Sequence, residues 1–212
     1  MYAKFLKRLF GFLLSLAALT VLSPLLLVLT ITGAAAMKGN PFFTQARPGR
    51  HEKIFRLIKF RSMTNEKGPD GKLLPDSQRL KPYGRFLRAS SLDELPELFN
   101  ILLGQMALVG PRPLLVQYLP YYTEEEKHRH DVRPGLTGLA QVNGRNLIGW
   151  DERLRYDTEY VKHITFTGDL QILLKTVRKV FTHEDLAVDT DTAETYLDEE
   201  RRGALHDQSI RD

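Results

Sequence analysis

The chain has 212 residues, of which 42% are hydrophobic and 26% are charged, a balance that fits one folded domain with accessory segments and excludes a disordered or fibrous protein. Cysteine is absent, which excludes disulfide bonds and cysteine-based metal sites. The formal net charge of +4 favours an anionic partner, and phospholipid head groups, nucleotide phosphates and nucleic acid are all candidates at this stage.

An uncharged, strongly apolar segment follows the first eight residues. It extends from Leu9 to Met37, and is longer than the roughly 20 residues that a membrane-spanning helix needs. Near its centre, Pro24 has no N–H for the carbonyl of Thr20, so the pair Ser23-Pro24 predicts a break in the helix. Each half would be about 21 Å long, which is too short to cross a hydrocarbon core of about 30 Å alone.

Basic residues flank this apolar segment on both sides: Lys4, Lys7, Arg8, Lys38, Arg47, Arg50 and Lys53. Because basic residues mark the cytoplasmic side of a membrane helix, near-symmetry favours a re-entrant helix-break-helix over residues 1–40, with both ends on one face. The alternatives are a kinked spanning anchor and a cleaved signal peptide. The apolar run is about twice the usual length of a signal h-region and contains a central proline, which disfavours cleavage.

The remaining residues predict a small, mostly helical α/β domain over residues 41–181. Residues 54–63 predict a strand that presents Lys59 near its end, and residues 65–76 predict a surface loop. Residues 83–90 predict a short amphipathic helix suited to a membrane interface. Further helices are expected at 95–106, 123–131, 151–163 and 169–181. Residues 182–212 are expected to form a charged, loosely ordered tail.

Two adjacent acids, Asp93 and Glu94, precede the helix that is expected at residues 95–106. A structural explanation is helix capping: Ser91 could cap the helix with Glu94 closing a capping box, or the first turn could begin at Pro96. The preceding Arg88 favours a chemical explanation, because a phosphate held by arginine would lie beside a carboxylate nucleophile. A carboxylate is already deprotonated at neutral pH and needs no base.

Two later segments present arginines from restricted or glycine-rich backbone. Pro111 and Pro113 fix φ on either side of Arg112, which limits the directions of its guanidinium and suits the binding of a diphosphate. Residues 132–145 are rich in glycine, side-chain amides and arginine, and could form a phosphate-holding turn that ends at Arg145. Neither a Walker A motif nor a dinucleotide-binding glycine fingerprint is present.

These motifs together resemble the bacterial sugar transferase family, the monotopic polyprenyl-phosphate phosphoglycosyl transferases. The likeness is carried, in chain order, by Ser23-Pro24, Lys59-Phe60-Arg61-Ser62-Met63, Asp93-Glu94-Leu95-Pro96, Pro111-Arg112-Pro113 and the segment from Arg133 to Arg145. In size the chain is similar to the minimal, PglC-like members. The resemblance implies a re-entrant membrane helix and a monotopic enzyme on the cytoplasmic face of the bacterial inner membrane.

The resemblance also implies a reaction. A UDP-sugar would donate its phosphosugar to undecaprenyl phosphate and release UMP, with Mg²⁺ as cofactor. Asp93 would be the nucleophile that forms a covalent aspartyl-phosphosugar, and Glu94 would hold the Mg²⁺. The residues expected to bind phosphate or nucleotide oxygens are Lys59, Arg88, Arg112 and Arg145.

Several alternatives remain open at this point. Within the family, a PglC-like enzyme for a glycoprotein glycan, with diacetylbacillosamine as its sugar, competes with a hexose-1-phosphate transferase that initiates capsule or exopolysaccharide. Outside enzymology, a membrane-anchored scaffold would tolerate the loss of Asp93. Inner-membrane phospholipids are expected partners, and apolar membrane-embedded surface would allow a homodimer. Nucleic acid is not expected, because the arginines are scattered among proline and glycine turns.

Overall fold

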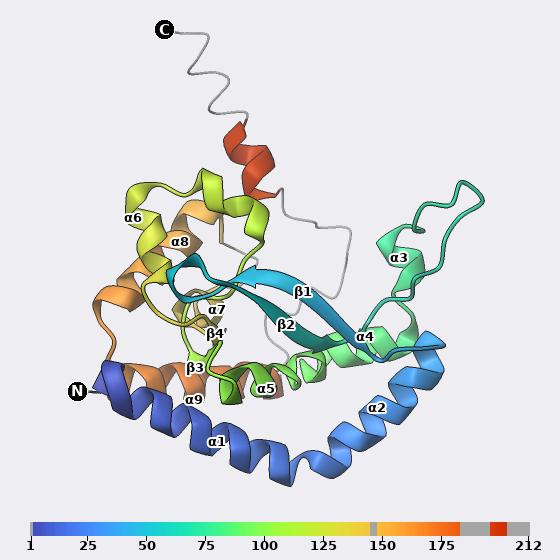
Figure 1. The fold of residues 1–212 in the computed structure, drawn as a ribbon, viewed down its shortest axis with the longest axis horizontal. Coiled ribbons are helices and arrows are strands. Elements are labelled where there is room, and N and C mark those ends of the chain that lie inside the picture. The colour runs from blue at the N-terminus through green and yellow to red at the C-terminus, as the bar shows by residue number, and fades with distance from the viewer. Residues whose placement is uncertain (1, 145–147, 183–195, 203–212) are drawn as a thin grey trace, which may run out of the picture.

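The structure, a computed structural model, describes residues 2–144, 148–182 and 196–202 (Figure 1). Short π- and 3₁₀-helical turns are labelled η. In chain order the elements are η1 (Tyr2–Leu6), α1 (Lys7–Val21), α2 (Ser23–Met37), β1 (Phe42–Pro48), η2 (Arg50–Glu52), β2 (Ile54–Phe60), α3 (Asp76–Arg79), α4 (Pro82–Ala89), η3 (Leu92–Glu94), α5 (Glu97–Leu102), β3 (Ala107–Val109), η4 (Val116–Tyr121), α6 (Glu124–Lys127), η5 (His128–His130), β4 (Gly135–Thr137), α7 (Leu139–Val142), α8 (Trp150–Lys162) and α9 (Phe166–Thr182). The predicted, mostly helical α/β class is confirmed.

The apolar N-terminal segment forms a bent pair of helices. Within the described residues no single helix is both long and apolar enough to cross a membrane, whereas α1 with η1 and α2 pass that test together and are bent by 65° at the break between them. The break lies at Leu22, directly before the predicted pair Ser23-Pro24, which begins α2. Ser23 Oγ donates to the carbonyl of Thr20 at 2.8 Å, and this oxygen also accepts from a backbone N–H at the end of α1, so both compensate for the N–H that Pro24 lacks.

The bent pair of α1 and α2, which is called the hairpin below, packs against the rest of the chain. Leu19 lies in a buried cluster with Leu57, Ile101 and Met106. Arg8 donates to the carbonyls of Ile101 at 2.5 Å and Leu102 at 2.8 Å, and so caps the C-terminus of α5. The hairpin and the domain therefore share one hydrophobic core.

Exposed apolar side chains continue from the hairpin onto three further helices. In Figure 1, α9, α5 and α4 follow one another along the face of the molecule from which the hairpin projects. The exposed large apolar residues on these three helices, together with the residue that ends α5, are Phe86, Phe99, Leu103, Phe166, Leu170, Leu174 and Val177. The spacing of those on α9 places them on one side of the helix. An apolar face of this extent is unusual on a protein surrounded only by water.

Two small sheets connect this face to the rest of the domain. Strands β1 and β2 pair antiparallel from Phe42 opposite Phe60 to Pro48 opposite Ile54, and β3 pairs with β4 in parallel. The ribbon of β1 and β2 begins after α2 and runs from the end of α2 back above α5 (Figure 1). The buried side chain of Asn100 fixes the ribbon to α5, because it accepts from the backbone N–H of Ile58 and donates to the carbonyl of Arg56.

Several predicted elements form with altered bounds. The strand expected over 54–63 ends at Phe60, and the helix expected over 95–106 is the shorter α5, preceded by η3. The prediction of a capping box between Ser91 and Glu94 is wrong: Ser91 has a φ of 55° and its side chain makes no capping hydrogen bond. The helix begins later, with Pro96 as its N-cap residue. The side chain of Glu94 is thereby left for other contacts.

Part of the predicted tail is helical and packed. Residues 197–202 form a helix in which Leu197 is fully buried against Leu114, Tyr118 and Trp150. Arg201 donates to Glu126 at 2.6 Å. The rest of the predicted tail, 183–195 and 203–212, lies outside the described residues. Composition alone did not indicate this contact, because one leucine within a charged segment carries no periodic pattern.

Leu197→Ala tests whether this helix belongs to the folded core. The substitution should lower the free energy of unfolding by about 2–5 kcal/mol, since it deletes a buried side chain and leaves a cavity. Tyr196→Ala is the matched control, because Tyr196 is adjacent and 52% exposed. Equal effects of the two substitutions in denaturant unfolding of detergent-solubilised protein would contradict the packing of Leu197.

Candidate active site

A cavity of about 540 Å³ lies between the β1–β2 ribbon, η3 and the segment that follows β3. Its walls bring together residues that are far apart in the sequence. The predicted site residues that line it are Lys59, Arg88, Asp93, Glu94 and Arg112. The remaining predicted ligand, Arg145, lies outside the described residues.

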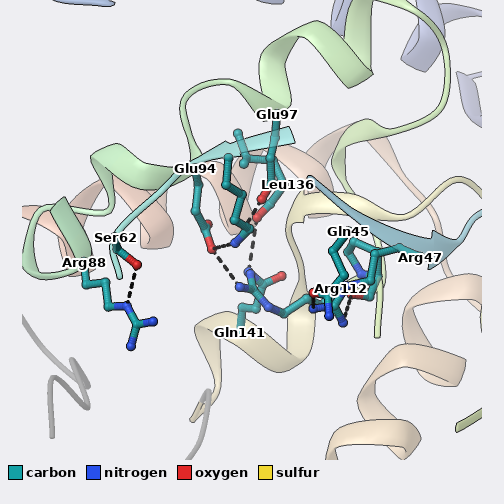
Figure 2. A network of polar contacts seen from close by, with 11 residues as sticks. Gln45, Arg47, Ser62, Arg88, Glu94, Glu97, Arg112, Leu136 and Gln141 are labelled. Atoms are coloured by element: carbon teal, nitrogen blue, oxygen red, sulfur yellow. Dashed lines mark hydrogen bonds and ion pairs between the residues drawn. The ribbon is translucent and has the colours of Figure 1, made fainter. Parts of the chain in front are cut away.

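The centre of the cavity is a carboxylate shared by two cations. Glu94 Oε1 accepts from Lys59 Nζ at 2.8 Å and from Arg112 Nη2 at 2.7 Å (Figure 2). Burial alone would raise the pKa of Glu94, but Arg112 and Lys59 hold it well below its ordinary value. Glu94 is therefore ionised across the physiological range and joins η3 to β2 and to the segment after β3.

Asp93 lies beside this shared carboxylate and faces the same cavity. Burial raises the pKa of Asp93 above its ordinary value and the charge of Glu94 adds to the rise, whereas Lys59, Arg112 and Arg88 oppose it. These three cations would also attract a phosphate group to the neighbourhood of Asp93. A carboxylate next to a phosphate-binding surface can act as a nucleophile on phosphorus.

Glu97 is a third acid in this network, and the sequence patterns did not single it out. Its side chain is 2% exposed, and its Oε1 lies 3.1 Å from Lys59 Nζ. Burial raises the pKa of Glu97 to about 7, with the charge of Glu94 adding to the rise and Lys59 opposing it. Lys59 thus lies between two carboxylates. The signal in the sequence was an acid in the first turn of a helix, which is common for structural reasons alone.

Arg88 enters the cavity from α4, which packs closely on the chain after β2. Arg88 Nε donates to Ser62 Oγ at 3.0 Å. The close approach requires glycine at position 84, because a Cβ there would lie 1.8 Å from the carbonyl oxygen of Ser62. The same helix is tied to the hairpin, since the hydroxyl of Tyr83 donates to the carbonyl of Leu29 at 2.8 Å. Arg88 therefore lies at the hairpin side of the cavity.

Arg112 is fixed from behind by a buried ion pair. Arg129 Nη2 donates to the carbonyl of Arg112 at 2.6 Å and to Asp157 Oδ2 at 2.7 Å. The side chains of Arg129 and Asp157 are only 1% and 3% exposed. In addition to the flanking prolines, Arg112 is thus held through its backbone carbonyl by Arg129 of η5, which is itself held by Asp157 of α8.

Arg47 also lines the cavity, on the far side of Arg112 from Glu94 (Figure 2). In the sequence it counted only as one of the basic residues that flank the apolar segment. Its approach to Pro113, 66 positions later, depends on how β1 packs against the rest of the domain. Local sequence patterns do not encode that packing.

The carboxylates of the cavity can be compared with the needs of Mg²⁺. Among the residues that the structure describes, no group of three or more His, Cys, Asp or Glu side chains is placed to hold a metal ion. Mg²⁺ is usually bound by one or two carboxylates together with waters and substrate phosphates. The neighbouring carboxylates of Asp93 and Glu94 supply donors of this kind. The residues therefore fit a Mg²⁺ that binds together with a phosphorylated substrate.

Arg129→Met tests the buried ion pair behind Arg112. It should cost about 3–5 kcal/mol of unfolding free energy, because the charge of Asp157 stays buried without its partner. Arg155→Met is the control, since Arg155 pairs with Glu152 on the surface with 62% and 46% of the side chains exposed, and should cost less than about 1 kcal/mol. A cost for Arg129→Met as small as that of the control, in denaturant unfolding, would contradict the buried pairing.

Comparison with known proteins shows the family to which the chain belongs. The bacterial sugar transferase family matches residues 2–183. A protein of Bacillus subtilis (strain 168), named as an uncharacterized sugar transferase, EpsL, is 50% identical over 182 residues, which cover 85% of this chain and 90% of that protein. The undecaprenyl-phosphate galactose phosphotransferase of Salmonella typhimurium is 39% identical over 204 residues, which cover 86% of this chain and 42% of that protein.

A third relative is the UDP-glucose:undecaprenyl-phosphate glucose-1-phosphate transferase of Klebsiella pneumoniae. It is 38% identical over 188 residues, which cover 84% of this chain and 40% of that protein. The chain thus spans most of the length of EpsL and less than half of the length of the other two relatives. The family match over nearly the whole chain agrees with the motifs at the break and in the cavity. This chain is a transferase and belongs to the bacterial sugar transferase family.

Proposed function

We propose that this chain transfers a hexose 1-phosphate from a UDP-hexose to undecaprenyl phosphate and releases UMP. The observation that carries the proposal is the placement of Asp93 in a cavity whose cations, Lys59, Arg88 and Arg112, converge on one region. The names of the Salmonella and Klebsiella relatives specify galactose and glucose. These names favour galactose or glucose over diacetylbacillosamine as the sugar. They therefore favour the alternative in which the enzyme initiates capsule or exopolysaccharide synthesis.

The reaction would proceed in two displacements at the same phosphorus. In the first, a carboxylate oxygen of Asp93 attacks the β-phosphorus of the UDP-hexose, the bond from that phosphorus to the bridging oxygen breaks, and UMP departs with the electron pair. In the second, a phosphate oxygen of undecaprenyl phosphate attacks the same phosphorus and displaces the carboxylate of Asp93. The product is undecaprenyl diphosphate hexose, and the enzyme returns to its starting form.

The surrounding side chains would bind and orient the charged groups. Lys59 and Arg112 both contact Oε1 of Glu94, so they fix the direction of that carboxylate and bring positive charge to the diphosphate. Arg88 brings positive charge to the opposite side of the cavity. Glu94, with Asp93 beside it, is the residue that would hold Mg²⁺. Bound Mg²⁺ would neutralise charge on the diphosphate and on the departing UMP.

The bent N-terminal helix pair supports a monotopic location on the cytoplasmic face of the inner membrane. A long polyprenol remains in the bilayer, so its phosphate must meet the nucleophile at the depth of the head groups. A re-entrant hairpin over residues 1–40 would hold a catalytic domain over residues 41–181 at that depth. The apolar residues on α4, α5 and α9 would rest in the interface beside it.

Asp93→Asn tests the reaction. Wild-type protein in lipid, supplied with Mg²⁺, undecaprenyl phosphate and each of several UDP-sugars, should release UMP from at least one UDP-hexose. Asp93→Asn should lower the rate on the order of a thousandfold or more, because the amide cannot act as the nucleophile. Asp70→Asn, in the exposed loop before α3, is the control and should retain the wild-type rate. Folded wild-type protein that releases UMP from no donor would favour the scaffold alternative.

Pro24→Ala tests the membrane geometry. A continuous helix over residues 9–37 would be about 44 Å long, more than enough to span a hydrocarbon core of about 30 Å. Because the chain has no cysteine, single cysteines can be introduced before and after the apolar segment, as Ala3→Cys and Lys72→Cys. Labelling with a membrane-impermeant maleimide then shows on which face of the membrane each position lies. Both should react from the cytoplasmic face in the wild-type background, and Ala3→Cys should move to the other face with Pro24→Ala. Wild-type labels on opposite faces would refute re-entry, and labels that stay together in Pro24→Ala would show that Pro24 is not required.

A further inference from the structure

Arg47 is a partly buried cation whose hydrogen-bonding capacity is not fully used. It lies on β1 opposite Phe55 and faces the cavity. Its Nη1 donates to the carbonyl of Pro113 at 3.3 Å and its Nη2 to Gln45 Oε1 at 2.6 Å. Its Nε is buried and has no hydrogen-bond partner within the described part of the chain. A buried donor without a partner costs free energy that a bound acceptor would recover.

The charge of Arg47 has no direct acidic partner. None of the carboxylates that the structure describes forms an ion pair with it, and the guanidinium of Arg112 is close enough to repel it. Burial lowers the pKa of Arg47 to about 10, and the charge of Arg112 adds to that decrease, whereas the charge of Glu97 opposes it. Two neighbouring arginines on the wall of a cavity, one of which has no acidic partner, form a surface that an anion would stabilise.

The position of Arg47 indicates which anion would reach it. Phe42 begins β1 shortly after the C-terminal end of α2, and Arg47 lies five residues further along the strand, about 16 Å from Phe42. Arg88, at the other end of the cavity, lies on the helix that is tied to α2. Figure 2 shows this order: Arg88 at one end, then Glu94, then Arg112, and Arg47 at the opposite end. A soluble nucleotide can enter this far end, whereas the phosphate of a lipid stays at head-group depth.

We propose that Arg47 and Arg112 together bind the nucleotide phosphates of the donor, on the side from which UMP departs. Gln45 and the carbonyl of Pro113 hold the guanidinium of Arg47 in place for this contact. The inference rests on the proposed function for the identity of the nucleotide. The binding of a nucleoside phosphate by these two arginines can nevertheless be measured without turnover.

Binding of UMP by the full-length protein in lipid nanodiscs tests the subsite. Arg47→Gln should raise the dissociation constant for UMP by about tenfold or more, since it removes a charge-assisted contact, and should reduce the increase in melting temperature that UMP produces. Arg47→Lys, which keeps the charge, should have a smaller effect. Arg56→Gln is the matched control on the neighbouring strand, because Arg56 is exposed and lies outside the cavity, and it should bind UMP as the wild type does.

The stability of the protein without ligand separates binding from a structural role. If Arg47 serves the ligand, Arg47→Gln should change the melting temperature of the ligand-free protein little. The substitution removes a cation that forms no ion pair in the folded protein, so no such pair is broken. The proposal would be overturned if both Arg47 variants had a much lower melting temperature and the fraction of protein that stays folded bound UMP as tightly as the wild type.

Kinetics distinguish the nucleotide from the lipid. Arg47→Gln should raise KM for the UDP-sugar and leave KM for undecaprenyl phosphate unchanged. A raised KM for undecaprenyl phosphate alone would overturn the proposal and assign Arg47 to the acceptor. UMP binding that depends on Arg47 in a protein without transferase activity would refute the proposed function but support the subsite. Wild-type UMP affinity in Arg47→Gln would refute the subsite alone.

Discussion

The ion pairs that Glu94 makes with Lys59 and Arg112 are the interaction on which the cavity depends. A single carboxylate oxygen connects the strand that carries Lys59, the turn that carries Asp93 and the proline-flanked segment that carries Arg112. Charges in such a cavity are stable only when they are paired, so each of these groups fixes the others. The result is a carboxylate, Asp93, held next to cations before any substrate is present, which is the preorganisation that phosphoryl transfer requires.

The N-terminal helix pair and this network are packed together as parts of one folded unit. α1 shares a hydrophobic core with α5 and β2, and α4 is bonded to α2 through Tyr83. The depth of the hairpin in a bilayer would therefore set the depth of Arg88 and Asp93 directly. The cavity then extends along the ribbon of β1 and β2, from the end near α2 and Arg88 to the end that holds Arg47. One end of the cavity would suit a lipid phosphate and the other a soluble nucleotide.

Sequence patterns predicted the features that local chemistry determines. The break before Pro24 follows from a missing N–H, and the placement of Asp93 and Glu94 in one cavity with Arg88 agrees with their position after an arginine-bearing helix. Sequence patterns did not predict the side-chain contacts that depend on long-range packing. Glu94 could have closed a capping box with Ser91, and only the approach of Lys59, 35 positions earlier, shows its actual partners. Arg47 had the pattern of a flanking surface charge, because nothing local to it encodes the contact with Pro113.

The measurement that tests the central claim most directly is the intact mass of the protein after incubation with UDP-hexose and Mg²⁺ in the absence of acceptor. A covalent intermediate on Asp93 predicts a mass increase of one phosphohexose, its disappearance when undecaprenyl phosphate is added, and no increase for Asp93→Asn. An unmodified mass at saturating donor, in protein that releases UMP only when acceptor is present, would contradict the two-step route. It would indicate direct attack of the lipid phosphate on the donor instead.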